Sequence, residues 1–219
     1  MKHAIIGDIH GRLDLLIMVI SRLKKNGIVL GKDTLVFLGD YCDRGKQSKQ
    51  VVQYLTNLKN KFGDKIVLLK GNHEELAENY VKCSYKDRFR NRVLWFGNGG
   101  NETVKSFKED GIDNILMPFI NKLQLYYETK DFICVHGGIP NRRNVKNVSA
   151  HELMWHRDNY KYDGKLQIVG HSIVEQAIQI NNTLFVDTGA FATDKLSAVI
   201  MPDMKVVVTK KVMVLEETY

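Results

Sequence analysis

The stretch LVFLGDYCDRG, residues 35–45, determines the fold class that we expect for this chain. Four apolar residues end at Gly39, and the turn that follows carries Asp40, Asp43 and Arg44. A short apolar run bounded by glycine is typical of a strand that is buried on both faces of its sheet. The polar turn then lies at the carboxyl end of that strand, where open α/β sheets bind their ligands.

The same unit of apolar run and polar turn occurs five times in the chain. The other four units span residues 4–11, 66–74, 132–138 and 167–172. Between the early units, apolar residues recur at helical spacing over 13–23 and 51–62. Such an alternation of strands and helices predicts an α/β fold whose first strands are largely parallel.

Other patterns mark the later part of the chain. Short apolar runs at 184–186, 198–201 and 206–209 have hairpin spacing, so we expect an antiparallel finish. The pattern over approximately 80–125 is mainly helical and predicts a helical side lobe. Because no linker interrupts the sequence, we expect residues 1–219 to form a single domain.

The composition excludes several classes of protein. With 44% hydrophobic residues, 26% charged residues and a net charge of +7, the chain is neither disordered nor collagen-like. Its three cysteines have no C-x-x-C spacing, which argues against a disulfide framework. No apolar run is long enough to span a membrane, and the N-terminus does not fit a signal peptide. We therefore expect a cytoplasmic protein without membrane contact.

The polar residues of the five turns are types that bind metal ions. They are Asp8, His10, Asp40, Asp43, Arg44, Asn72, His73, His136 and His171. Carboxylate, imidazole and amide ligands without thiolates suit manganese, iron or zinc. Each turn alone also has a simpler interpretation, since Asp40 could pair with Arg44 and Asn72 could cap a helix. Five such turns at matching strand ends favour one convergent site.

Five motifs in these turns point to a known family. They are G-D-x-H-G at 7–11, G-D-x-x-D-R-G at 39–45, G-N-H-E at 71–74, H-G-G at 136–138 and G-H at 170–171. In order and approximate spacing they resemble the phosphoprotein phosphatase family of calcineurin-like metallophosphoesterases. The motifs extend over about three quarters of the chain. The 95–100 segment is most similar to the small bacterial and bacteriophage (lambda-type) Ser/Thr protein phosphatases. One departure is Cys42, where the family often has an aliphatic residue.

The resemblance implies the calcineurin-like fold, with packed mixed β-sheets flanked by helices and a dinuclear metal site at the carboxyl ends of strands. Two divalent ions per chain are implied, with manganese favoured and iron, zinc, nickel and cobalt as alternatives. The implied ligands of the first ion are Asp8, His10 and Asp40, and those of the second are Asp40, Asn72, His136 and His171. Asp40 then bridges the two ions.

The resemblance also implies a mechanism. A hydroxide that bridges the two ions attacks phosphorus in line with the leaving group. His73 protonates the departing oxygen, and Asp43 orients its imidazole. The phosphate is bound by Arg44, Arg157 and Asn72, and the planar fork of arginine matches phosphate oxygens. The second phosphate-binding residue could instead be His156 or Arg142, because the sequence around Arg157 is less distinctive.

The implied activity is hydrolysis of phosphoserine and phosphothreonine in proteins, with phosphotyrosine as a further substrate. A phosphorylated protein or peptide is thus the expected partner. Symmetrical diadenosine tetraphosphate hydrolysis and a nucleic-acid phosphatase are the alternatives. A binding module without catalysis is disfavoured because binding alone needs no general acid such as His73. The sequence leaves the oligomeric state open.

A run of basic residues between Lys82 and Arg92 is not part of these motifs. It contains five lysines and arginines, interrupted by Asp87. It is either the solvated face of a helix or a surface that attracts acidic or phosphorylated substrates.

Overall fold

Residues 1–108, 111–140, 143–158 and 164–211 are described by the computed structural model. Its first sheet has the strand order β10-β9-β1-β2-β3. The strands are β1 (His3–Ile6), β2 (Thr34–Phe37), β3 (Ile66–Leu68), β9 (Lys195–Met201) and β10 (Lys205–Lys210). β1, β2 and β3 are parallel, with Ala4 opposite Leu35 and Leu35 opposite Ile66. β9 and β10 form the antiparallel hairpin that the sequence predicts.

The second sheet has the strand order β4-β5-β6-β8-β7. Its strands are β4 (Tyr126–Glu128), β5 (Phe132–Val135), β6 (Leu166–Val169), β7 (Ile178–Ile180) and β8 (Thr183–Phe185). β5, β6 and β8 are parallel, and β4 and β7 are antiparallel edges. The expectation that residues 184–186 join an antiparallel finish is therefore wrong in part. β8 belongs to the second sheet, where its hydrogen bonds to β6 are parallel.

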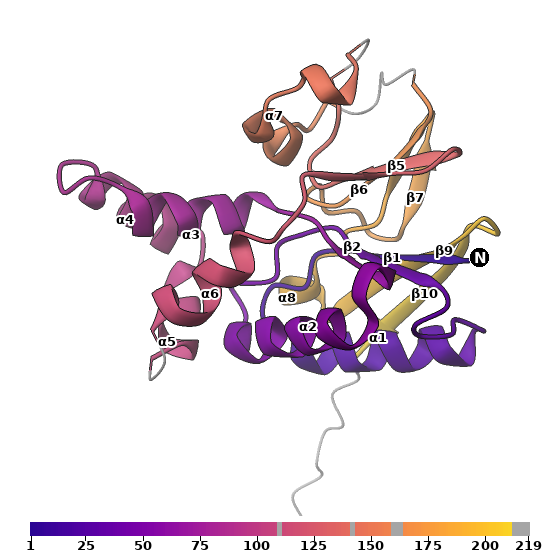
Figure 1. The fold of residues 1–219 in the computed structure, drawn as a ribbon, viewed down its shortest axis with the longest axis horizontal. Helices are drawn as coiled ribbons and strands as arrows, with labels where there is room; N and C mark the ends of the chain where they lie inside the picture. Colours follow the sequence, from indigo (N-terminus) through magenta and orange to yellow (C-terminus); the bar gives the residue numbers. More distant parts are fainter. Residues whose placement is uncertain (109–110, 141–142, 159–163, 212–219) are drawn as a thin grey trace, which may run out of the picture.

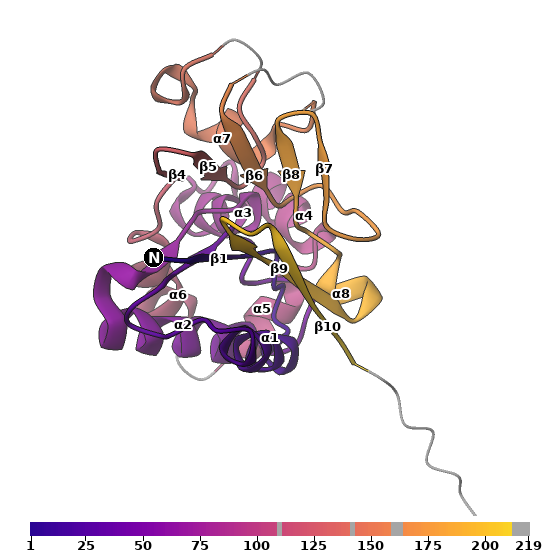
Figure 2. The same cartoon turned by 90° about the vertical axis from the view of Figure 1, so that its right-hand side faces the viewer.

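The two sheets pack face to face between outer layers of helices (Figures 1 and 2). α1 (Leu13–Lys25) and α2 (Ser48–Phe62) lie on the outer side of the first sheet, and α7 (Ala150–Trp155) lies beside the second. Successive residues of β1 point to opposite faces. Ala4 and Ile6 pack with the helices, whereas Ile5 packs with the second sheet. The central strands are thus buried on both faces, which confirms the predicted fold class.

In the sequence, a group of helices lies between the last parallel strand of the first sheet, β3, and the first strand of the second sheet, β4. These helices extend to one side of the molecule (Figure 1). These are α3 (Asn72–Lys82), α4 (Arg88–Gly97), α5 (Gly100–Ser106) and α6 (Ile112–Ile120). Three short helices complete the described chain: η1 (Gly63–Lys65), η2 (Val145–Asn147) and α8 (Ala190–Thr193). α3 begins directly after β3, and the turn between α4 and α5 returns to the strand ends, where Gly99 accepts a hydrogen bond from the backbone of Arg44.

Candidate metal centre

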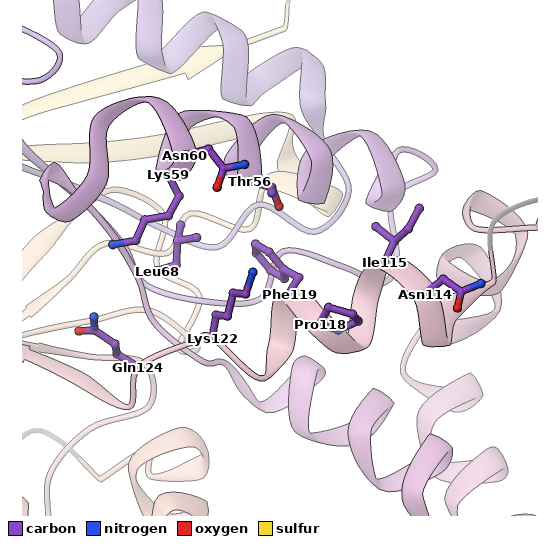
Figure 3. Close-up of a pocket in the computed structure, with 10 residues that line it drawn as sticks. All are labelled: Thr56, Lys59, Asn60, Leu68, Asn114, Ile115, Pro118, Phe119, Lys122 and Gln124. Carbon is purple, nitrogen blue, oxygen red and sulfur yellow. The ribbon is translucent and has the colours of Figure 1, made fainter.

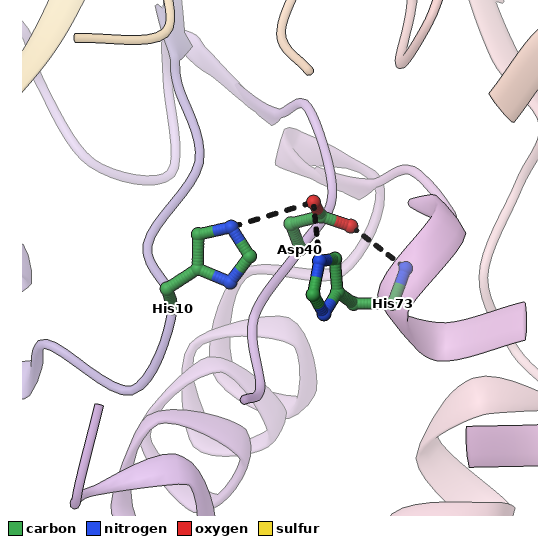
Figure 4. A group of neighbouring side chains, drawn as sticks. All are labelled: His10, Asp40 and His73. Atoms are coloured by element: carbon green, nitrogen blue, oxygen red, sulfur yellow. Dashed lines mark hydrogen bonds and ion pairs between the residues drawn. The ribbon is translucent and has the colours of Figure 1, made fainter. Parts of the chain in front are cut away.

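The structure brings the five polar turns together between the carboxyl ends of strands from both sheets. Two groups of buried side chains result, and within each group the possible ligand atoms lie within 4.8 Å of one another. One group is His10, Asp40 and His73, shown in Figure 4. The other is Asp40, His136 and His171. Asp40 belongs to both groups, which is the arrangement that a bridging carboxylate requires.

The carboxylate of Asp40 is surrounded by imidazoles. One oxygen lies 3.5 Å from Nε2 of His10, and the other lies 3.4 Å from Nε2 of His136. The backbone N–H of His73 donates to the same carboxylate at 3.0 Å. Burial alone would raise the pKa of Asp40, but the positive charge that its four histidine neighbours, His136, His73, His10 and His171, carry when protonated outweighs burial and holds this pKa well below its usual range. Asp40 is therefore a carboxylate at neutral pH.

A buried glutamate, Glu74, holds the Asp40 turn in place. Its carboxylate accepts hydrogen bonds from the backbone N–H groups of Asp40 and Tyr41, both at 2.9 Å, and of Gly71 at 3.0 Å. These bonds fix an unusual backbone, because Asp40 has a φ of 52°, in the left-handed region. Position 71 must be glycine here, since a Cβ atom would lie 2.1 Å from a carboxylate oxygen of Asp40. The sequence analysis included Glu74 only as the last residue of the G-N-H-E motif and gave it no role of its own.

Hydrogen bonds at the rear of the rings orient two of the histidines. Nδ1 of His10 lies 2.9 Å from the carbonyl of Cys42, and Nδ1 of His136 lies 2.9 Å from that of Leu38. A carbonyl can only accept, so Nδ1 carries the proton and Nε2 presents its lone pair to the centre. Nε2 of His136 then faces the amide oxygen of Asn72 at 3.0 Å as well as Asp40. Three electron-rich atoms that face one another fit a cation between them.

Asp8 and His171 support the same interpretation. Asp8 Oδ1 and His171 Nε2 are buried polar atoms for which the described residues provide no hydrogen-bond partner. Such atoms are costly unless a bound ion or water satisfies them. Burial lowers the pKa of His171, like that of His10, to about 3, so both imidazoles are neutral and able to bind metal at neutral pH. The residues present therefore fit a dinuclear metal site.

Asp8 itself lies outside both groups of ligand atoms. Its Oδ2 accepts a hydrogen bond from the backbone N–H of His171 at 2.9 Å. Burial, together with the charge of Asp187, raises the pKa of Asp8 well above its usual value. Burial likewise raises the pKa of Asp187 to about 6. The sequence analysis missed Asp187, although it follows β8 as the other polar residues follow their strands. It was missed because residues 184–186 were expected to form part of an antiparallel hairpin and not a parallel strand with a polar residue at its carboxyl end.

His73 and Asp43 form a second part of the site. Nδ1 of His73 lies 2.7 Å from Oδ2 of Asp43. The indole of Trp95 donates to both carboxylate oxygens, at 3.1 and 3.0 Å, and the hydroxyl of Thr103 donates to Oδ1 at 2.6 Å. Burial would lower the pKa of His73, but Asp40 and Asp43 outweigh it and raise this pKa above 6.5. His73 is thus held in one orientation and favours its protonated form.

The two predicted phosphate-binding arginines lie at the border of the site. Arg44 is half-buried, with its guanidinium 3.1 Å from Nε2 of His10 and 4.2 Å from the ring centre of Phe191. Arg157 is exposed, and its guanidinium donates to the carbonyl of His171 at 2.9 Å. His156, the alternative to Arg157, instead lies 3.1 Å from the carbonyl of Asp158. Arg142, the other alternative, lies outside the described residues.

A separate pocket of about 270 Å³ opens between α2 and α6 (Figure 3). Leu68, Ile115 and Phe119 form an apolar lining, and Lys59 and Lys122 are its charged residues. The ten lining residues include neither a carboxylate nor an imidazole. The chemistry predicted from the sequence is therefore concentrated at the strand ends and not in this pocket.

Comparison with known proteins agrees with the geometry of the site. The family model described as calcineurin-like phosphoesterase matches residues 1–191. Serine/threonine-protein phosphatase 2 of Salmonella typhimurium is 26% identical over 212 residues, which covers 88% of this chain and 89% of that protein. These matches confirm the resemblance that the motifs indicate.

Two solved structures have the same fold at low sequence identity. A candidate diadenosine tetraphosphatase has a TM-score of 0.70 and 18% identity, with 95% of this chain and 92% of that chain covered. A cold-active protein-tyrosine phosphatase from a Shewanella species has a TM-score of 0.68 and 17% identity, with 94% and 77% covered. Within the described residues, no helix has both the length and the apolar character needed to cross a membrane.

Proposed function

Because the chain belongs to the calcineurin-like phosphoesterase family, we propose that it is a metal-dependent phosphomonoesterase that acts on phosphoserine and phosphothreonine in proteins. One observation carries this proposal. A hydrogen-bonded pair of His73 and Asp43 lies directly beside the Asp40 carboxylate, with Nε2 of His73 4.0 Å from it. Serine and threonine oxygens are poor leaving groups, and a buried proton donor at this point serves their departure.

In this proposal, Asp8, His10 and Asp40 hold one divalent ion, and Asp40, Asn72, His136 and His171 hold the other. Manganese is the favoured metal because of the family resemblance, and the donors, oxygen and nitrogen atoms without a thiolate, suit manganese, iron or zinc. When bound, the two ions would neutralise phosphate oxygens and bring the pKa of a water near neutrality. The residues fix the positions of these ligands before binding, since their turns are held by Glu74 and by backbone carbonyls.

The proton donor is His73 in the same proposal. Its Nδ1–H is held by Asp43, so the proton on Nε2 faces the centre of the site. The imidazolium gives this Nε2 proton to the oxygen that leaves phosphorus, and Asp43 stabilises the charged ring before the transfer. Trp95 and Thr103 act through Asp43 and are positioning residues.

Phosphate recognition falls to Arg44 and Arg157, with the amide of Asn72. The guanidinium group of Arg44 lies beside His10, a proposed ligand of one ion, and that of Arg157 lies beside His171, a proposed ligand of the other. A phosphate between them would receive donors from two directions, which fixes the leaving oxygen relative to His73. The free thiols of Cys42, Cys83 and Cys134 agree with the reducing, cytoplasmic setting that we propose.

A comparison of three substrates tests the proposed function. The metal-depleted protein should be inactive and should recover activity with manganese. With manganese, kcat/KM should be higher for a phosphoserine peptide than for diadenosine tetraphosphate or a 3′-phosphorylated oligonucleotide. Dinucleotide turnover far above peptide turnover would contradict the proposed substrate class, and full activity in a metal-free preparation would contradict the proposed mechanism.

A further inference from the structure

A line of large apolar side chains is exposed on the outer side of α4. Tyr85, in the turn that precedes the helix, is 93% exposed, Phe89 is 78% exposed and Val93 is 57% exposed. Phe89 and Val93 are four residues apart and lie on one face of the helix, and Tyr85 precedes them in the adjoining turn. These three exposed side chains are here called the outer stripe of α4. Single exposed apolar residues are common, whereas a contiguous row marks an interaction surface.

Cations flank the outer stripe on both sides. Arg90 lies on one side of the strip, and Arg88 and Arg92 lie on the other, as their positions on the helix require. The guanidinium groups of Arg88 and Arg92 rest near the rings of Tyr80 and Phe96, at 5.7 and 5.3 Å from the ring centres. The ten residues of α4 include no carboxylate. The surface is therefore apolar along its middle and positive along its edges.

A shallow groove runs beside the stripe. It has a volume of about 420 Å³, and its lining includes Arg90 and Leu94, which is 46% exposed. The one acidic residue that lines it is Asp87, whose carboxylate accepts a hydrogen bond from the hydroxyl of Ser84 at 2.7 Å. An acidic side chain of a bound partner could enter this groove and lie beside Arg90, next to the outer stripe.

The helix that carries the outer stripe also contacts the proposed active site. The same helix ends with Trp95, whose indole donates to Asp43. At about 1.5 Å of rise per residue, Phe89 lies roughly 9 Å from Trp95 along the helix axis, and Tyr85 lies farther away, in the turn before the helix. An extended peptide advances about 3.3 Å per residue, so roughly three residues span the distance between Phe89 and Trp95, and a few more extend to Tyr85.

We propose that the outer stripe of α4 is a docking surface for an acidic, apolar segment of the protein substrate, about three to five residues from the phosphorylated residue. This inference rests on the proposed function. Apolar side chains of the substrate would cover Phe89 and Val93, and its aspartates or glutamates would pair with Arg90 and the arginines of the opposite edge. An anionic membrane, a nucleic acid and a second copy of this chain are rival occupants.

The test uses three phosphoserine substrates and p-nitrophenyl phosphate. The first peptide is short, the second carries an acidic and leucine-containing extension four residues away, and the third carries lysines in place of the acids. The double variant Phe89→Ser/Val93→Ser should raise KM and lower kcat/KM about tenfold for the acidic extended peptide alone. The short peptide and p-nitrophenyl phosphate should change by less than about twofold, because neither residue contacts the catalytic groups.

Charge reversal gives a second, independent readout. Lys86 is an exposed cation in the turn before α4. Lys86→Glu/Arg90→Glu should exchange the preference between the acidic and the lysine-bearing peptides. Lys130→Glu, an exposed residue on another part of the surface, is the matched control and should leave the preference unchanged. An exchange of preference is not expected from a merely destabilised helix, so this readout separates docking from misfolding.

Several results would overturn the proposal. Equal turnover of all three peptides, by the parent chain and by both double variants, would refute the docking surface and leave the proposed function intact. Hydrolysis of p-nitrophenyl phosphate without any peptide turnover would refute both. The Phe89→Ser/Val93→Ser variant could also leave peptide kinetics unchanged but lose a dimer, sedimentation with phosphatidylserine vesicles or oligonucleotide binding. Such a result would assign the stripe to the corresponding rival occupant.

Discussion

Around Asp40, the Nε2 atoms of His10 and His136 face the carboxylate without donating to it, whereas the carboxylate of Asp43 accepts hydrogen bonds from three different residues. The side of the site near Asp40, here called the ligand side, includes Asp8 Oδ1 and His171 Nε2 without a partner among the described residues. The side near Asp43, here called the acid side, is closed by His73, Trp95 and Thr103.

This difference indicates what each side depends on. The ligand side includes buried polar atoms that a bound ion would satisfy, so its residues are expected to destabilise the metal-free chain and to matter through metal binding. The acid side is already satisfied by the protein, so its residues are expected to matter through orientation. Substitutions on the two sides should therefore separate metal content from rate.

The largest effect is expected from Asp40→Asn, on the ligand side. Because this carboxylate is proposed to bridge both ions, the variant should lose both metals, and kcat should fall by at least about 10⁴-fold. Asp8→Asn should chiefly affect one ion. Metal content per chain after gel filtration measures this, and Asp131→Asn, on an exposed turn, is the matched control. Two metals retained in the Asp40 variant would contradict the bridging role.

The next effect is expected from His73→Asn, on the acid side. A general acid contributes roughly 10²–10⁴-fold where the leaving oxygen needs a proton, so the loss should fall on phosphoserine far more than on p-nitrophenyl phosphate. Metal content should remain near that of the parent chain, although His73 lies in one group of possible ligands. His151→Asn, at an exposed position, is the control. Equal losses on both substrates would show that His73 is not the leaving-group acid.

A third prediction concerns stability on the ligand side. Burial raises the pKa of Asp187 to about 6 from an unfolded value of 3.8. Between these values the folded chain binds the extra proton, so Asp187 costs stability as the pH rises, by up to about 3 kcal/mol. The metal-free Asp187→Asn variant should therefore gain stability relative to the parent between pH 4.5 and 7.5. Denaturant unfolding at both pH values measures the difference, which should be absent in Asp131→Asn.

The sequence was sufficient to predict the ligand side because each contribution is local. An apolar run, a glycine and a polar residue occur within a few positions, and parallel strands then bring their carboxyl ends to one edge. Asp8, His10, Asp40, Asn72 and His136 were found in this way, although their roles as ligands remain a proposal. Asp187 obeys the same rule and was missed only because its strand was expected in the wrong sheet.

The acid side was only half predictable, because its contacts join distant parts of the chain. Asp43 and His73 are contained in recognisable motifs, but Trp95 and Thr103 lie 52 and 60 positions from Asp43. A hydrophobic pattern does not specify that Trp95 of α4 and Thr103 of α5 contact Asp43, which lies in the loop before α2. The edge strands β4 and β7 were also missed, since YYE and IQI are too short to show alternation.

The smallest effect is expected from Thr103→Val, which keeps the volume of the side chain and removes its hydroxyl. The hydroxyl donates to Asp43 Oδ1 at 2.6 Å and accepts from the backbone N–H of Asp43 at 2.8 Å. Thr103 is fully buried, so water does not replace these bonds, and the variant should lose about 1–3 kcal/mol of stability. The less firmly held imidazole should lower kcat on phosphoserine about tenfold, with normal metal content.

The serine variant shows whether this loss comes from the hydrogen bond. Thr103→Ser keeps the hydroxyl and loses a methyl group, so it should recover most of the rate on phosphoserine while remaining somewhat less stable than the parent chain. The rate on p-nitrophenyl phosphate should change little in either variant, because that substrate leaves without a proton. If Thr103→Val lost stability but kept the full rate on phosphoserine, Thr103 would support the fold alone, and the acid side would not depend on its hydrogen bonds for orientation.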